Sequence, residues 1–252
     1  MAGGTLNSTE RTQALARRRR VRILSSAGIV VVLIIVAYLA SDPGGGRAST
    51  DTSKQRAAPA CDADVPQVPA PRQYEAPGRV LEEGVDYAAV ITTSCGDIAI
   101  DLLETTAPEN VNNFLFLAQE GFYDGLQFFR VERNSVIQAG DPNNVVYEAP
   151  DGPGYTIPDE LPAQPKEYVF GAVAMSNQGP PDTAGSQFFI VIHENRPAGY
   201  QAAYSIFGRV DESSYEVLRE IGRQPTKGGR EPLKAVRPIA PIYIESIEIL
   251  ER

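Results

Sequence analysis

The sequence predicts a mainly β domain, a closed β-barrel with two helices, preceded by one transmembrane helix. Three observations support this prediction: an uncharged apolar run near the N-terminus, a series of short apolar segments separated by turn residues, and two isolated helical patterns. The chain has 252 residues, about the upper size of one domain, and 42% of them are hydrophobic. This composition excludes collagen and a wholly disordered chain, and two cysteines are too few for a disulfide-dense toxin.

Charge is distributed unevenly along the chain. The net charge is −9, but residues 1–47 hold seven arginines and two carboxylates, a net +5, so the remainder carries −14. A basic head and an acidic body suggest two environments. We expect no nucleic-acid partner, because a phosphate-binding surface should be basic. We also expect no zinc site, because such sites mostly use four N or S ligands and the chain has one histidine and two cysteines.

Residues 23–40 are the predicted transmembrane anchor. They contain no charged residue, and eighteen helical residues span about 27 Å, close to the hydrocarbon thickness of a bilayer. Five arginines, Arg17–Arg20 and Arg22, lie immediately before this run, so the positive-inside rule makes residues 1–22 a basic cytoplasmic segment and places the body outside. The prediction is a single-pass cell-membrane protein with an extracytoplasmic domain. The alternatives are a buried core helix and a signal peptide cut after Ala40, although Tyr38 is bulky for such a site.

Residues 41–80 are predicted to be a Pro/Gly-rich linker that spaces the domain, residues 81–252, from the membrane. The two cysteines, Cys61 and Cys95, lie in this linker and near the start of the domain. On the oxidising side of a membrane such a pair predicts a disulfide, and two unpaired thiols are the alternative. No CxxC motif indicates a redox role.

The body contains short apolar segments that predict strands. The first two flank Ser94–Asp97, which indicates a hairpin. The last segment alternates apolar and polar residues, as a half-buried strand does. The predicted strands cover residues 87–93, 98–103, 126–131, 135–139, 169–175, 187–192, 205–210 and 242–250.

Two helical patterns interrupt these strands. Pro108 begins the first, which has Val111, Phe114, Leu115, Leu117 and Ala118 on one face, and Gly121 ends it. Ser213 or Ser214 caps the second, and we expect Gly222 to end it, with Val217, Leu218 and Ile221 facing inward. Many short strands with two isolated helices favour a closed β-barrel over a parallel βαβ sheet.

The usual catalytic signatures are absent from the sequence. It has no GxSxG elbow, Walker loop or HExxH motif, and we interpret His193 as a partly exposed residue at a strand end. A polar and aromatic set remains. In a strand, Gln187 and Phe189 share one face while Phe188 faces the other. Gln187 and Phe189, together with Arg130 and Gln138, would form an apolar slot with hydrogen-bonding walls. An arginine that packs over phenylalanine rings in a purely structural role is an equal alternative.

Three motifs in this region resemble those of the cyclophilin family of peptidyl-prolyl isomerases. The family pattern F-H-R-x-x-x-x-F-x-x-Q-G-G-D corresponds to Phe128–Asp141, with the arginine-to-glutamine spacing kept. The pattern M-A-N followed by G-S-Q-F-F corresponds to Met175–Asn177 and Gly185–Phe189, and F-G-x-V to Phe207–Val210. The resemblance runs from about Asp86 to Arg252. It implies an eight-stranded antiparallel closed barrel capped by two α-helices.

The resemblance also implies a non-covalent mechanism without a cofactor. Arg130 would donate to the twisted prolyl nitrogen in the transition state, and Gln138 would hold the substrate carbonyl. Phe189 would form the floor of the proline pocket and Val136 its wall. Asn177 and Gln187 would orient the flanking peptide backbone. The remaining substrate-binding candidates from these motifs are Phe128, Ser176 and Tyr204.

Four positions depart from the family pattern. Phe129 replaces the usual histidine before the arginine, Ser135 replaces the pocket phenylalanine, and Tyr204 replaces the histidine ahead of F-G. The tryptophan associated with tight cyclosporin binding cannot exist, because the chain has no tryptophan. We therefore expect weak or no cyclosporin binding.

These observations lead to one functional hypothesis and two alternatives. The hypothesis is a membrane-anchored, bacterial-type peptidyl-prolyl cis-trans isomerase that acts on proline-containing peptides and on unfolded or exported proteins outside the membrane. Slow prolyl isomerisation limits folding, so such an enzyme would accelerate it. The alternatives are a non-catalytic peptide-binding or chaperone module on the same scaffold, and a passive surface protein.

Overall fold

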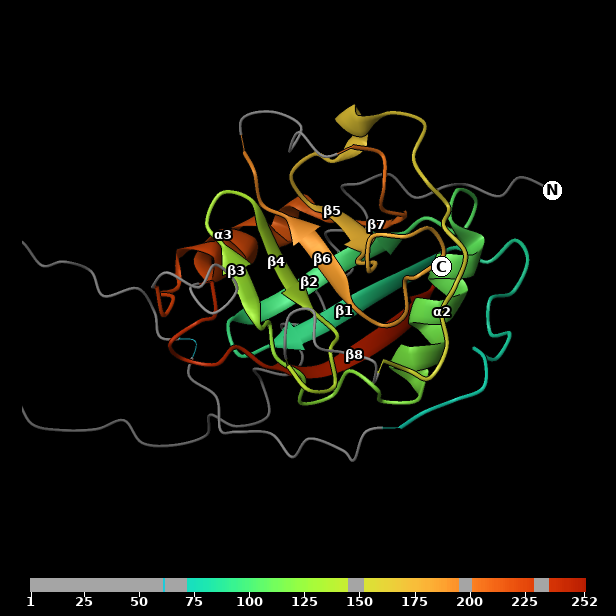
Figure 1. The fold of residues 1–252 in the computed structure, drawn as a ribbon, viewed down its shortest axis with the longest axis horizontal. Helices are drawn as coiled ribbons and strands as arrows, with labels where there is room; N and C mark the ends of the chain where they lie inside the picture. Colours follow the sequence, from blue (N-terminus) through green and yellow to red (C-terminus); the bar gives the residue numbers. More distant parts are fainter. Residues whose placement is uncertain (1–60, 62–71, 145–151, 195–200, 229–235) are drawn as a thin grey trace, which may run out of the picture. The chain divides into compact units, whose positions relative to one another are not determined.

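The computed structural model describes residue 61 and residues 72–144, 152–194, 201–228 and 236–252. Within these residues the chain forms eight β-strands, two α-helices and two short 3₁₀ helices (Figure 1). The 3₁₀ helices are η1 (Pro165–Glu167) and η2 (Glu212–Ser214). The other elements are β1 (Tyr87–Thr93), β2 (Gly96–Leu102), α2 (Pro108–Gln119), β3 (Arg130–Glu132), β4 (Val136–Ala139), β5 (Ala172–Met175), β6 (Phe188–Val191), β7 (Ile206–Val210), α3 (Tyr215–Arg223) and β8 (Ile244–Glu251).

The eight strands form one antiparallel sheet in the order β3-β4-β6-β5-β7-β2-β1-β8. The sheet is a half-barrel, whereas the sequence predicted a closed barrel. Its edge strands are β3 and β8, and the segments that precede them pair through a bridge between Gln127 and Tyr243. Within the predicted strand 126–131, only residues from Arg130 onward join the sheet ladder. Leu126 and Phe128 instead bond through their backbones to Ile244 and Ile242.

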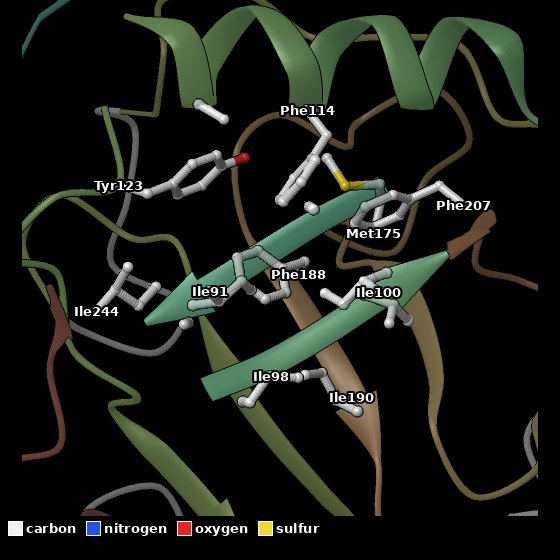
Figure 2. Packing of buried hydrophobic residues seen from close by; sticks show 14 of the residues in the cluster. Ile91, Ile98, Ile100, Phe114, Tyr123, Met175, Phe188, Ile190, Phe207 and Ile244 are labelled. Atoms are coloured by element: carbon white, nitrogen blue, oxygen red, sulfur yellow. The ribbon is translucent and has the colours of Figure 1, made fainter. Parts of the chain in front are cut away.

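The main core fills the concave side of this sheet, beneath α2 (Figure 2). Phe114 projects from α2 toward the strands, and its ring lies 5.8 Å from that of Phe188 and 5.1 Å from that of Phe207. Phe188 is fully buried in this core, while its neighbour Phe189 belongs to a separate apolar cluster. The predicted alternation of residues 187–189 between the two faces is therefore confirmed.

Helix α2 begins at Pro108 and ends before Gly121, as the sequence predicted. Its N-cap is Ala107, which has no side chain to accept hydrogen bonds. Glu160 supplies the missing acceptors from a distant loop: its carboxylate accepts from the backbone N–H of Glu109 at 3.1 Å and of Asn110 at 2.9 Å. A carboxylate at this position satisfies free N–H groups and complements the helix dipole.

Helix α3 lies at the other end of the sheet from α2 (Figure 1). Leu218 and Ile221 are buried, as predicted, but the helix continues through Gly222 to Arg223. Gly222 is thus inside the helix and does not end it. A Cβ atom there would lie 2.7 Å from Cδ1 of Ile192, so the glycine allows close packing of the helix on the residue after β6.

The segment before β1 is attached to the domain at two places. Residues 72–81, which we call the strap, lie against α2: Oδ1 of Asn112 accepts from the backbone N–H groups of Val80 and Leu81 at 2.9 and 3.0 Å. Ahead of the strap, Cys61 forms a disulfide with Cys95, with a Cα–Cα distance of 4.5 Å. This bond joins the chain before the strap to the β1–β2 hairpin.

The predicted anchor, residues 23–40, lies outside the described residues, as do residues 1–22. Among the helices that the structure does describe, none is both long enough and apolar enough to cross a bilayer.

Candidate functional site

The strand register brings three predicted site residues into one row. Arg130 on β3 pairs with Gln138 on β4, and Gln138 pairs with Phe189 on β6. Directly paired residues on adjacent strands point to the same face of a sheet. The row therefore places a guanidinium, an amide and an aromatic ring side by side on the convex face, opposite the main core.

Arg130 is held from two sides. Its Nη1 donates to Oε1 of Gln138 at 2.9 Å, and its Nη2 lies 2.9 Å from Oε1 of Glu132. Nε of Arg130 is buried and has no hydrogen-bond partner within the described residues. The side chain retains 20% of its exposed area, so the fixed guanidinium can still reach a bound molecule. Arginine suits this arrangement because its donors form a rigid planar fork.

Gln138 is 3% exposed and lies at the centre of a hydrogen-bonded network. Its Nε2 donates to Oε1 of Gln187 at 2.8 Å and to Oγ of Ser176 at 3.2 Å. Nε2 of Gln187 in turn donates to Oδ2 of Asp141 at 2.6 Å. Four predicted or motif residues thus form a continuous path from the buried Asp141 to Arg130.

A cleft of about 500 Å³ adjoins this network. Gln138, Ser176, Asn177 and Gln187 line it, so four predicted residues share one cavity. The strap contributes Gln73 to the lining, and Tyr155 also lines the cleft. Most of the lining residues have hydrogen-bonding side chains, which favours an extended peptide backbone as the ligand.

Tyr155 connects the cleft to α2. Its hydroxyl donates to Oδ1 of Asn113 at 2.7 Å, and Nδ2 of Asn113 donates to the carbonyl of Gly185 at 2.8 Å. Burial, with a smaller contribution from Tyr74, raises the pKa of Tyr155 above its ordinary value. The phenol therefore stays neutral at physiological pH and keeps its proton to donate.

The apolar part of the site is a cluster around Phe189. Val136 and Tyr204 belong to it, as predicted residues, together with Tyr168 and Ile206. The rings of Phe189 and Tyr204 meet edge to face at 5.2 Å. Phe189 is 4% exposed, so its ring is almost covered by its neighbours.

Two predicted residues lie differently from the others. Asn177 lines the cleft, but its Nδ2 already donates to the carbonyl of Ala203 at 2.8 Å, which ties the loop after β5 to the residues before Tyr204. Phe128 lies in the main core with its ring 6.4 Å from that of Phe188. The structure therefore does not bring Phe128 to the convex face, because its backbone pairs with Ile242 and its side chain points inward.

Three residues of the site had no role in the sequence-based prediction. Glu132 pairs with Arg130, Asp141 accepts from Gln187, and the hydroxyl of Tyr168 bonds to both backbone groups of Tyr204. For Glu132 a signal existed, because residues two apart in a strand share a face. The contacts of Asp141 and Tyr168 cross between distant segments and leave no local pattern. Among the described residues, no group of three or more His, Cys, Asp or Glu side chains could hold a metal ion.

Known proteins resemble this chain in sequence. Residues 88–249 match the family model described as cyclophilin type peptidyl-prolyl cis-trans isomerase/CLD. Peptidyl-prolyl cis-trans isomerase B of Bacillus subtilis is 44% identical over 132 residues, which cover 49% of this chain and 88% of that protein. Peptidyl-prolyl cis-trans isomerase of Synechococcus elongatus is 37% identical over 134 residues, covering 53% and 87%.

Solved structures show the same fold. A crystal structure of a Cryptosporidium parvum cyclophilin type peptidyl-prolyl cis-trans isomerase aligns with a TM-score of 0.56 and 28% identity. The alignment covers 66% of this chain and 99% of that one. A second structure of that protein, in the presence of the dipeptide Ala-Pro, aligns with a TM-score of 0.57 and 27% identity.

Proposed function

This chain belongs to the cyclophilin family and is a peptidyl-prolyl cis-trans isomerase, and we propose that Arg130 and the network around Gln138 carry the reaction at the convex face of the sheet. The observation that supports the proposal best is the row formed by Arg130, Gln138 and Phe189. It puts a fixed cation and an apolar ring on the two sides of Gln138, and these are the two features that a prolyl amide and its ring would use.

The physical problem is the barrier to rotation about the X–Pro bond. Amide resonance gives a barrier of about 18–20 kcal/mol, and the resonance is lost when the bond is twisted. The prolyl nitrogen then gains a lone pair that it lacks in the planar ground state. A guanidinium N–H of Arg130 donating to that lone pair stabilises the twisted state and not the planar one, so it lowers the barrier. No covalent intermediate or cofactor is needed.

Gln138 holds the substrate carbonyl in this proposal. Both of its Nε2 hydrogens are engaged, at 2.8 Å with Gln187 and at 3.2 Å with Ser176. The longer bond is the one that a substrate carbonyl would replace, because the Ser176 hydroxyl can rotate to another partner. The proline ring packs on the Phe189 cluster, and the flanking peptide lies in the adjacent cleft.

A proline-peptide isomerisation assay tests these roles. The full-length chain, purified in mild detergent, should accelerate cis-trans exchange in an Ala-Pro peptide, and Arg130→Ala should reduce kcat/KM by about 100-fold or more. If the wild-type chain and Arg130→Ala both match buffer, the chain does not catalyse the exchange and the proposal fails. Equal rates above buffer would remove Arg130 from the mechanism.

We further propose that the enzyme acts outside the cytoplasmic membrane on unfolded or exported proteins. The support is the sequence of residues 1–40, where an arginine cluster precedes an uncharged apolar run. A disulfide at Cys61–Cys95 suits an oxidising compartment. Protease added to intact cells or spheroplasts should remove the isomerase domain, and full protection of the domain would overturn this location.

A further inference from the structure

The hydrogen bonds between Asp141 and Arg130 run in one direction. Oδ2 of Asp141 accepts from Nε2 of Gln187 at 2.6 Å, and Oε1 of Gln187 accepts from Nε2 of Gln138 at 2.8 Å. Oε1 of Gln138 then accepts from Nη1 of Arg130 at 2.9 Å. We call this path the amide relay. At each step an amide donates on one side and accepts on the other.

The direction of the relay is fixed at its buried end. Asp141 is fully buried, and its other oxygen, Oδ1, accepts from the backbone N–H of Asn143 at 2.7 Å. Both of its oxygens thus act as acceptors, Oδ1 from the Asn143 N–H and Oδ2 from Gln187. Gln187 must therefore turn its NH₂ group toward Asp141 and its oxygen toward Gln138. Gln138 must in turn direct its oxygen to Arg130.

The consequence at Arg130 is a matter of polarity. A guanidinium has donors and no acceptor, so it is held by Gln138 only if the amide oxygen faces it. With the amide reversed, N–H groups of Gln138 and Arg130 would face each other. Ser176 does not oppose either orientation, because a hydroxyl both donates and accepts.

We propose that Asp141 is a positioning residue for the isomerase reaction, which sets the amide orientation of Gln187 and Gln138 and thereby holds the Arg130 guanidinium in place. This inference rests on the proposed role of Arg130. It gives a function to a buried carboxylate that is not among the residues lining the substrate cleft.

The test is to exchange the carboxylate of Asp141 and the amide of Gln187 between the two positions. In Asp141→Asn, the Asn143 N–H keeps the amide oxygen, so the new NH₂ group faces Gln187 and the relay reverses. We expect kcat to fall about tenfold or more, with KM changed less. The reason is that Arg130 loses its hydrogen bond to Gln138, and the N–H groups of the two side chains then face each other. In Asp141→Asn/Gln187→Glu, the new carboxylate accepts both from the introduced asparagine and from Gln138, so the orientation at Arg130 is restored.

The double variant decides the question because it keeps the same asparagine in the Asp141 turn. Its kcat should rise several-fold above that of Asp141→Asn, and any loss of peptide contacts at the substituted Gln187 should appear in KM. A double variant no more active than Asp141→Asn would overturn the proposal, and so would an Asp141→Asn protein with wild-type kcat. If Asp141→Asn does not fold, Gln187→Met cuts the relay and leaves the turn intact; an unchanged kcat there would overturn it.

A second readout does not depend on turnover. In wild type, the side-chain NH₂ protons of Gln138 should exchange slowly with solvent and show the NMR shifts of hydrogen-bonded donors. Asp141→Asn should change these shifts, and the double variant should restore them. If the wild-type chain lacks activity but these shifts follow the pattern, the proposed function fails and the relay stands. Identical Gln138 signals in wild type, Asp141→Asn and the double variant would contradict the proposed relay, whatever the measured activity.

Discussion

Arg130 lies directly opposite Gln138 on the antiparallel pair of β3 and β4, and its Nη1 donates to the Gln138 side chain at 2.9 Å. Because Glu132 holds Nη2 on the other side, the guanidinium plane is defined by two partners before any peptide binds. Preorganised donors stabilise a transition state without having to reorganise during the reaction.

Arg130→Lys should therefore inactivate the enzyme despite keeping the charge. A lysine ammonium is a single compact group and cannot contact Gln138 and Glu132 while also reaching the prolyl nitrogen. We expect kcat/KM to fall about 100-fold or more in the proline-peptide assay. Arg133→Lys, an exposed arginine on the same hairpin, is the matched control and should retain wild-type activity. A fully active Arg130→Lys protein would show that charge alone suffices.

Asn112→Ala should destabilise the domain by about 2–4 kcal/mol, because the buried side chain bonds three backbone groups of the strap. Its Oδ1 accepts from Val80 and Leu81, and its Nδ2 donates to the carbonyl of Gly78 at 3.0 Å. Urea denaturation measures the loss, and the exposed Asn143→Ala serves as the control. A change below about 0.5 kcal/mol would mean that the strap does not support the domain.

Removing the disulfide should also lower stability. The bond closes a loop with a sequence separation of 34 residues. For such a loop the chain-entropy relation gives about 4 kcal/mol. The Cys61→Ser/Cys95→Ser chain should unfold at lower urea concentration, with isomerase activity at 25 °C unchanged because neither cysteine takes part in the hydrogen bonds that hold Arg130. Non-reducing mass spectrometry of the wild-type chain provides the check on the bond itself: two free thiols would contradict it.

Glu104 should make the free energy of unfolding depend on pH in the mildly acidic range. Burial raises the pKa of Glu104 above its ordinary value of 4.5, although its carboxylate accepts from the backbone N–H of Tyr87 at 2.6 Å. The folded protein thus holds this proton at pH values where the unfolded chain has released it, so stability falls as pH rises from 4.5 through the raised pKa. Glu104→Gln should remove this part of the pH dependence in urea titrations. Parallel curves for the two proteins would contradict the assignment.

Cyclosporin should inhibit the enzyme weakly or not at all. The chain has no tryptophan to contact the drug, and Ser135 and Tyr204 replace two residues of the family's pocket. The tryptophan would fall within residues 195–201, of which 195–200 lie outside the described residues. Titration of the isomerase assay with cyclosporin measures the effect. Strong inhibition at drug concentrations stoichiometric with the enzyme would contradict this prediction.

Local periodicity correctly predicted which side chains of a strand or helix face the core, because this does not depend on which other segment packs against it. The alternation around Phe188 and the apolar face of α2 follow from a period of 2 and of 3.6 residues, and both are confirmed. The end of α3 was predicted wrongly, because Gly222 is a common stop signal but here serves contact with Ile192.

The site was less predictable, since its geometry depends on which strands become neighbours. The family motifs placed Arg130, Gln138, Gln187 and Phe189 together, but the same motif included Phe128, which the backbone pairing with Ile242 turns inward. The contact of Asp141 could not be predicted for a different reason. Contacts such as Asp141 with Gln187 join residues 46 apart and leave no periodic signal.

The disulfide has a mechanical consequence. Any tension on the chain ahead of Cys61 enters the domain through the covalent bond to Cys95, at the β1–β2 hairpin. Gln73, which lines the cleft, is therefore not exposed to tension that is applied to the chain ahead of Cys61. Reduction of the bond would reroute that force directly through the strap and into the peptide-binding cleft.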